Sequence, residues 1–360
     1  MPQAAQQVQQ LFIRTATAQG IASELPTLYH PQEGWRAWLC RGGLGGGTEA
    51  FLRRMADLAQ TAGRRVECFP DARGGDSLCA VRLPDEKFCF LDADGPGAWD
   101  LRCPGACEET VALNVFWHKP ILQERRGEIL RLMADLHREQ ARCVRFLKAA
   151  RAIKRDMAFV AAGCTDAGKV ERYAARFAAR HFPAPSGRVG LESRRFLTAV
   201  TGQGLLLRRA AVLDICPTVF LFEDDCGAAV PGILSILRAY ALGNGLDVFQ
   251  CPCLLDPDGP PEHLLLPQLG LALLSVNRRH PIDLEGAQRV LSSRFLEKED
   301  LRAHRCRLSF CRRTLHELLE EAYEAAAAAE RTRASLDEIY AAATDFPALL
   351  AQADSIWAGQ

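Results

Sequence analysis

The feature of this sequence that most constrains its fold is an internal repeat. The stretch Phe12–Gly20, FIRTATAQG, returns 184 positions later as Phe196–Gly204, FLTAVTGQG. Further on, the apolar stretch 37–40 corresponds to 219–222 at an offset of 182, as do the glycines that follow a predicted helix, Gly63 and Gly245. Several matches in the same order at a nearly constant offset indicate a tandem duplication.

The repeated unit has the pattern of a strand, a loop, a helix and two further strands. Apolar residues at 3.6-residue spacing predict the first helix over residues 51–59, between predicted strands at 37–40 and 66–69. Strands joined through helices favour parallel pairing. We therefore expect an α/β fold with two tandem parallel-sheet domains, residues 1–185 and 186–360, each followed by long helices.

Composition restricts the classes of partner. Lysine plus arginine and aspartate plus glutamate both number 44, so the formal net charge is zero, and only a local patch would attract nucleic acid or an anionic membrane. The 14 cysteines include no CxxC pair, which is typical of reduced thiols used as small apolar residues. The N-terminal stretch has no basic start followed by an apolar core. We expect a cytoplasmic protein without nucleic-acid or membrane partners.

A glycine-rich stretch between the first predicted strand and helix resembles a phosphate-binding loop. In RGGLGGGTEA, residues 41–50, Gly42 and Gly47 have the spacing of the motif GxxxxGK[ST]. Backbone N–H groups of such a loop bind phosphates at the start of a helix. The candidate nucleotide-binding residues are Gly42, Gly43, Gly45, Gly46, Gly47 and Thr48. The strand 88–92 ends at Asp92, which is the candidate ligand for Mg²⁺.

Two substitutions in this loop disfavour nucleotide chemistry. Thr48 stands where the motif has lysine, and Glu49 stands where it has the hydroxyl. A carboxylate about 4 Å from a phosphate charge is repelled by about 4 kcal/mol at an effective dielectric constant of about 20. Compensation requires another cation, for which Arg41, Arg53 and Arg54 are the nearby candidates; the alternative is that they face solvent.

The second copy departs further from the motif. The offset of 182 places Asp224 on Gly42, Ala229 on Gly47 and Val230 on Thr48, and Ser275 stands where the first copy has Asp92. The acidic run 223–225 predicts repulsion of phosphate. Three roles remain open for it: binding of Mg²⁺ or Ca²⁺, capping of the next helix, or exposure to solvent.

From residue 12 to residue 346 these motifs resemble the uncharacterised duplicated P-loop ATPase (nucleotide-kinase-like) proteins of Gram-positive bacteria. Members of that family have a strand ending in lysine and then GGPGTGKST, where this chain has Arg41 and GGLGGGTEA. The resemblance implies two P-loop NTPase-like domains and a site for ATP and Mg²⁺. The family's Ala-Pro-His after the strand-ending aspartate is replaced here by 95–97, GPG, while His280 remains in the second half.

Two functions follow as hypotheses. One is a remnant ATP site in the N-terminal half, with hydrolysis weak or lost because both lysines are absent; whether the chain is an enzyme stays open. The other is a pseudo-NTPase that binds a protein partner through its helical segments. No catalytic residue is assigned, although Cys251, Cys253 and His263 follow one another closely around a loop. Trp99, Trp117 and His118 are candidates either for lining a pocket or for anchoring the helices.

Overall fold

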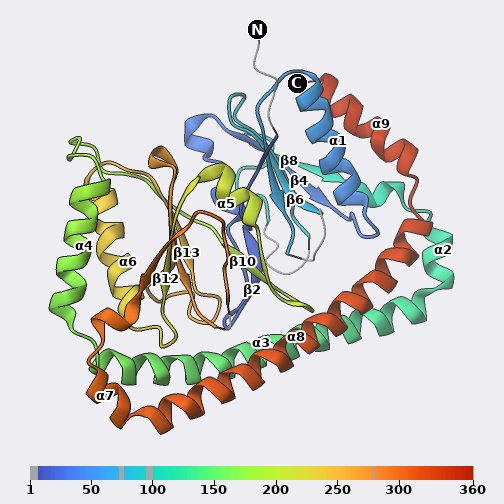
Figure 1. Cartoon of the computed structure of the whole chain (residues 1–360). Helices are drawn as coiled ribbons and strands as arrows, with labels where there is room; N and C mark the ends of the chain where they lie inside the picture. Colours follow the sequence, from blue (N-terminus) through green and yellow to red (C-terminus); the bar gives the residue numbers. More distant parts are fainter. Residues whose placement is uncertain (1–6, 73–76, 95–99, 279, 360) are drawn as a thin grey trace.

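Each half of the chain builds one sheet, and the two sheets have the same strand order (Figure 1). The computed structural model describes residues 7–72, 77–94, 100–278 and 280–359. The first sheet has the order β1, β5, β6, β7, β4, β8 (Gln7–Gln9, Val66–Pro70, Leu78–Leu83, Phe88–Asp92, Arg36–Arg41, Glu108–Ala112). The second has the order β9, β13, β14, β15, β12, β16 (Glu192–Arg194, Val248–Pro252, Pro261–Leu266, Leu271–Val276, Thr218–Glu223, Gln288–Leu291). The two halves therefore repeat one topology.

Both sheets are mixed, so the prediction of parallel sheets is wrong. β4 pairs in parallel with β7 and β8, but β6 runs antiparallel to β5 and β7. In the second half β14 is likewise antiparallel to β13 and β15. The reason is the length of the connections: short links return the chain as hairpins, whereas parallel neighbours need a longer crossover. The broader prediction of an α/β fold is confirmed.

One helix follows the first central strand of each half and covers its sheet. These helices are α1 (Gly47–Thr61) and α6 (Ala229–Gly243). α1 buries Phe51, Leu52 and Met55 completely, and the ring of Phe51 meets that of Phe90 at 5.9 Å. In α6 the fully buried residues Ile233, Leu234 and Leu237 form the corresponding face. The apolar spacing seen in the sequence is thus the packing face of each helix.

The two halves meet at small hairpins near the centre of the molecule. These are β2–β3 (Arg14–Thr17, Gly20–Ser23) and β10–β11 (Thr198–Thr201, Gly204–Leu207), and in the second half β11 leads into α5 (Arg209–Ile215). Phe12 and Phe196, which correspond in the internal repeat, exchange backbone hydrogen bonds of 3.0 and 2.7 Å. A reciprocal pair between equivalent residues means that the two halves are related by an approximate two-fold axis at this point.

Two long helices lie against each other below the sheets (Figure 1). A short helix precedes each: α2 (Lys119–Glu124) before α3 (Arg126–Gly163), and α7 (Lys298–Ala303) before α8 (Arg305–Ala342). α3 and α8 have 38 residues each, which gives a length of about 57 Å. Their buried residues recur every seven positions, as in a coiled coil: Ile129, Leu136, Cys143, Ala150 and Met157 in α3, and Leu308, Leu315, Ala322, Ala329 and Leu336 in α8.

The long helices exchange their ends between the two halves. α3 carries the chain away from the first sheet, and the next helix, α4 (Ala167–His181), packs on α6 of the second half. α8 returns the chain, so that α9 (Phe346–Ala358) packs on α1 of the first half (Figure 1). In the described part of the chain no helix combines the length and the hydropathy needed to cross a bilayer. The helical extension of each half therefore completes the core of the other half.

Candidate functional site

Of the six candidate residues, Gly42, Gly43, Gly45 and Gly46 lie in one tight turn between β4 and α1, and Gly47 and Thr48 begin α1. Gly42, Gly45 and Gly46 have φ angles of 74°, 74° and 83°, a region that glycine adopts readily. The N–H of Thr48 donates to the carbonyl of Gly43 at 3.1 Å. A Cβ on Gly43 would lie only 1.9 Å from Oγ1 of Thr48, so this position also requires glycine. The turn has glycine where its geometry demands it.

The backbone N–H groups of this loop already bind carboxylates of the same chain. Oδ2 of Asp94 accepts from the N–H groups of Gly42 and Gly43, the second at 3.2 Å. Oδ1 of Asp337, in α8, accepts from the N–H of Gly45 at 3.0 Å. In a phosphate-binding loop such N–H groups contact phosphate oxygens. Here two aspartates supply the anionic oxygens.

The loop is also in close contact with α8. A Cβ added to Gly45 would lie 2.4 Å from the backbone nitrogen of Ala341 and 2.6 Å from the carbonyl carbon of Tyr340. The ring of Tyr340 in turn packs on that of Trp117, with centroids 4.9 Å apart. Trp117 therefore anchors the helices, one of its two predicted roles. The residues 95–97 and Trp99 lie outside the described part of the chain.

The three arginines that were candidates for the missing lysine make ion pairs elsewhere. Arg41 pairs with Asp100 at 3.0 Å, and Arg53 pairs with Glu49 one helical turn away at 2.8 Å. Arg54 pairs with Asp354 of α9 at 2.7 Å. The carboxylates of Glu49 and Asp354 are partly exposed, and that of Asp100 is almost fully exposed. A different arginine, Arg333, lies 3.1 Å from Asp337 and so reaches the carboxylate at the loop.

Asp92, the candidate magnesium ligand, belongs to a buried ion-pair cluster. Arg14 lies 2.7 Å from Asp92 and 2.7 Å from Asp71, and all three side chains are at most 7% exposed. The second oxygen of Asp92 accepts from the N–H of Asp94 at 3.1 Å. Among the described residues no group of three or more His, Cys, Asp and Glu side chains is arranged to hold a metal ion. The guanidinium of Arg14 lies beside Asp92, where the sequence predicts Mg²⁺.

In the second copy of the loop, backbone N–H groups donate hydrogen bonds to a carboxylate of the same loop. Oδ1 of Asp224 accepts from Cys226 and Gly227 at 3.1 and 2.8 Å, and Oδ2 accepts from Val230 at 2.9 Å. Asp224 is 3% exposed. Its neighbours also have partners, because Glu223 pairs with Arg289 and Asp225 with Arg278. Of the roles proposed for the acidic run, Asp224 has that of capping the next helix.

Comparisons of the chain with protein-family models, with curated proteins and with solved structures found no match. The function is therefore inferred from the geometry of the molecule.

A second polar cluster, which the sequence did not predict as a unit, lies in the second half, where β13 ends and β14 begins. Nζ of Lys154, in α3, lies 2.7 Å from Sγ of Cys253 and 2.9 Å from Oε1 of Glu262. The Lys154 side chain also reaches the second loop, since a Cβ on Gly227 would lie 4.0 Å from its Cε. Only the proximity of Cys253 and His263 was visible in the sequence. Lys154 is 99 positions from Cys253, and no local pattern links them.

The groups of this cluster are poorly suited to nucleophilic catalysis. Burial raises the pKa of the Cys253 thiol even though Lys154 is adjacent, so the thiol stays protonated at neutral pH and is a weak nucleophile. Burial lowers the pKa of His263 to about 3. Nδ1 of His263 accepts from the N–H of Ser275 at 3.1 Å, which assigns the proton of the neutral ring to Nε2. This cluster has the features of a buried structural network.

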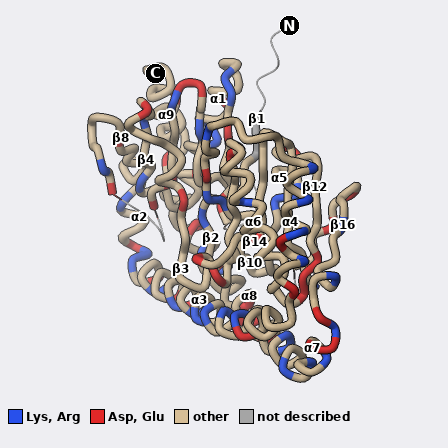
Figure 2. Tube along the Cα trace, turned by 90° about the vertical axis from the view of Figure 1, so that its left-hand side faces the viewer, with Lys and Arg blue, Asp and Glu red and all other residues tan. Residues whose placement is uncertain are grey.

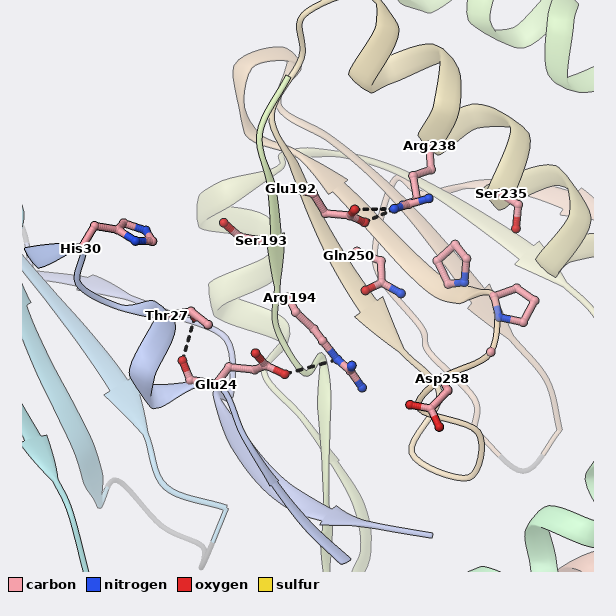
Figure 3. A pocket seen from close by; sticks show the side chains of 13 residues that line it. Glu24, Thr27, His30, Glu192, Ser193, Arg194, Ser235, Arg238, Gln250 and Asp258 are labelled. Atoms are coloured by element: carbon pink, nitrogen blue, oxygen red, sulfur yellow. Dashed lines mark hydrogen bonds and ion pairs between the residues drawn. The ribbon is translucent and has the colours of Figure 1, made fainter. Parts of the chain in front are cut away.

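A cleft of about 690 Å³ lies where the first half meets β9 and the loop before β14 (Figure 3). Four of its five Asp, Glu and Arg side chains are paired with one another, Arg238 with both oxygens of Glu192 and Arg194 with Glu24 at 3.3 Å. The fifth, Asp258, lies 3.9 Å from Arg151 outside the cleft. Arg194 also donates to the carbonyl of Pro257 at 3.0 Å. The pairing neutralises these four charges, so the cleft has no strong preference for a charged ligand.

Proposed function

We propose that this protein is a pseudo-NTPase, a duplicated P-loop-like scaffold that does not bind nucleotide and acts through its helices. The observation that carries the proposal is the occupation of the loop N–H groups by Asp94 and Asp337. A phosphate would have to displace both carboxylates to use the same donors. It would also have to separate the loop from α8, which contacts Gly45.

Electrostatics supports the same conclusion. At about 4 Å and an effective dielectric constant of about 20, each carboxylate repels a phosphate charge by about 4 kcal/mol. A micromolar dissociation constant corresponds to about 8 kcal/mol of binding free energy, so two such repulsions are enough to remove it. Arg333 is nearby but is held by Asp337 at 3.1 Å.

The second half favours the proposal independently. The carboxylate of Asp224 lies inside its own loop, where it accepts hydrogen bonds from three backbone N–H groups. The same solution thus occurs in both copies with different residues: Asp94 and Asp337 in the first, Asp224 in the second. In both halves, carboxylates of the chain itself thus bind the N–H groups that a phosphate would need.

A remnant site for ATP and Mg²⁺ in the first half is the alternative. The glycine geometry of the loop favours it, since Gly42, Gly45 and Gly46 keep the positive φ angles of an anion-binding turn. It requires Asp94 to leave the loop and α8 to move away. Its magnesium ligand would be Asp92, which would have to exchange Arg14 for the metal.

Calorimetric titration of the full chain with ATP and Mg²⁺ tests the proposal. We expect no binding up to millimolar ATP for the wild-type protein. A double variant Asp94→Asn with Asp337→Asn removes both charges and is expected to gain weak binding of ATP or inorganic phosphate. The control is Asp57→Asn with Asp85→Asn, two exposed aspartates away from the loop, which should change nothing. Micromolar binding by the wild-type protein, abolished by Gly45→Asp, would overturn the proposal in favour of the remnant site.

A further inference from the structure

The charged side chains that α3 exposes most are basic. Every charged residue of α3 that is classed as exposed is basic: Arg126, Arg131, Arg138, Arg145, Lys148 and Arg155. The four acidic residues of the helix are partly buried, and each is paired with an arginine; they are Glu128, Asp135, Glu139 and Asp156. In a chain of zero net charge, this segregation creates a local basic surface.

The basic side chains of this surface lie in a row. Arg131, Arg138 and Arg145 are seven residues apart, and Lys148 follows one turn later. At 1.5 Å per residue the row from Arg131 to Lys148 is about 25 Å long. Figure 2 shows Lys and Arg recurring along α3 at the outer edge of the molecule. In the described part of the chain, Arg131, Arg145 and Lys148 have no ion-pair partner.

Several exposed positions between and beyond the basic residues are apolar, although His137 is exposed beside Arg138. Ala134, Ala141 and Ala152 are exposed between them. Two large apolar side chains also face solvent, Leu130 at 56% exposure and Phe159 at 77%. They are 29 residues apart, or about 43 Å along the helix, so they flank the row at its two ends. The paired helices form the lower boundary of the molecule in Figure 1, so a flat surface can approach them.

Two kinds of extended polyanion have the charge that complements this face. A nucleic-acid duplex is contacted through its phosphates by Arg and Lys together with Ser, Thr, Asn, Gln and backbone N–H groups. Its phosphate backbones wind around the duplex axis, so they diverge from a straight row of basic residues. A bilayer with anionic headgroups is flat and accepts Phe and Leu at the level of the acyl chains. Alanine, leucine and phenylalanine beside the basic row favour the bilayer.

We propose that the exposed face of α3 docks on the surface of an anionic lipid bilayer. Arg131, Arg145 and Lys148 contact the headgroups, and Leu130 and Phe159 insert at the two ends. The inference deepens the proposed function, on which it rests, by naming the partner of the helical scaffold. The helix lies on the bilayer and does not cross it.

Vesicle co-sedimentation of the full chain tests this inference. Vesicles of phosphatidylcholine alone are compared with vesicles that contain about one third phosphatidylserine. The wild-type protein is expected to sediment with the anionic vesicles only, and less as salt is raised. Each neutralised basic residue should weaken binding about fivefold, so Arg131→Gln with Arg145→Gln and Lys148→Gln should weaken it about a hundredfold.

The matched control removes three exposed positive charges elsewhere, by Arg176→Gln with Arg180→Gln in α4 and Arg209→Gln in α5. This control should bind like the wild-type protein. A separate change, Phe159→Ser, should weaken binding and leave its salt dependence unchanged.

Absence of binding to anionic vesicles, or equal losses in the α3 triple variant and its control, would overturn the inference. So would binding to a short DNA duplex, but not to vesicles, that depends on the same three residues. The nucleotide titration separates the two proposals: ATP binding by the wild-type protein refutes the pseudo-NTPase, whereas failure to bind vesicles leaves that assignment intact and removes only the lipid partner.

Discussion

Asp337 accepts a hydrogen bond of 3.0 Å from the N–H of Gly45, a residue 292 positions earlier in the chain. The contact joins the last turns of α8 to the glycine loop of the opposite half. It depends on the exchange of helices, because α8 follows the second sheet in sequence but ends beside the first. The loop is therefore a structural joint between the halves as well as a turn between β4 and α1.

Substitution of Gly45 by alanine tests whether this joint contributes to stability. The new Cβ would lie 2.4 Å from the backbone of α8, so we expect the helix to shift and the free energy of unfolding to fall by several kcal/mol. The matched control is Gly46→Ala. Gly46 also has a positive φ angle but has nothing within 4 Å of an added Cβ.

The control should therefore show only the backbone cost of alanine in a left-handed conformation, about 1–2 kcal/mol. Urea unfolding of the two variants measures the difference. Equal losses for both variants would mean that α8 does not rest on the loop in solution.

Local sequence patterns were sufficient to predict the turn itself. The glycines at 42, 45 and 46 do adopt positive φ angles, and the predicted helix follows at Gly47. What fills the turn could not be predicted, since Asp337 comes from a helix 292 positions away and Asp94 from beyond the end of β7. A loop motif specifies backbone geometry, whereas its ligand depends on tertiary contacts.

The parallel sheet was predicted wrongly for a comparable reason. Apolar runs such as 66–69 and 88–91 identify buried strands but carry no information about direction. Direction follows from the length of the connections: the helical crossover leaves β4 and β5 parallel, whereas the shorter links on either side of β6 make it antiparallel to its neighbours. The seven-residue spacing of Leu136, Cys143, Ala150 and Met157 was present in the sequence and would have predicted the paired long helices.

Removal of Arg14 should destabilise the first half strongly. Arg14→Met removes the guanidinium that the buried carboxylates of Asp71 and Asp92 share, and breaking such a buried ion-pair cluster costs about 3–5 kcal/mol. Arg53→Met, which breaks an exposed pair with Glu49, should cost at most about 0.5 kcal/mol. Chemical unfolding at neutral pH compares the two variants.

The ion-pair cluster of Arg14, Asp71 and Asp92 also predicts how the protein responds to Mg²⁺. Because Arg14 neutralises Asp92, millimolar Mg²⁺ should leave the melting temperature of the wild-type protein unchanged. A ligand that binds only the folded state stabilises it by mass action. A rise in melting temperature with Mg²⁺ that disappears in Asp92→Asn would show that Asp92 is a metal ligand after all.

Stability should fall as the pH is lowered from about 6.5 to about 3. Burial lowers the pKa of His263 to about 3 and also lowers the pKa of His280, whereas both are near 6.5 in the unfolded chain. In that window the unfolded state binds more protons than the folded state, so the free energy of unfolding rises with pH. The slope is at most about 1.4 kcal/mol per pH unit for each histidine.

Glu262 adds to this loss at the acid end of the window. Burial opposes its ionisation, but Lys154 holds the pKa of Glu262 at about 2, so its contribution is lost below about pH 4.5. His263→Asn, which keeps an acceptor near the N–H of Ser275, should flatten the slope between pH 6.5 and 4.5. Urea unfolding as a function of pH measures it. An unchanged slope in the variant would assign the acid lability to other groups.

Leu349 gives the most direct test of the helix exchange. It lies near the C-terminal end of the chain, is fully buried, and packs with Phe51 and Met55 of α1 in the core of the first half. Leu349→Ala should therefore cost about 2–5 kcal/mol, whereas the exposed neighbour Gln352→Ala should cost less than about 0.5 kcal/mol. Hydrogen exchange locates the effect: amide protection should fall in α1, some 300 positions earlier, and persist in α6. Loss of protection in α6 instead of α1 would mean that the C-terminal helix packs on its own half, and the exchange of helices would then be wrong.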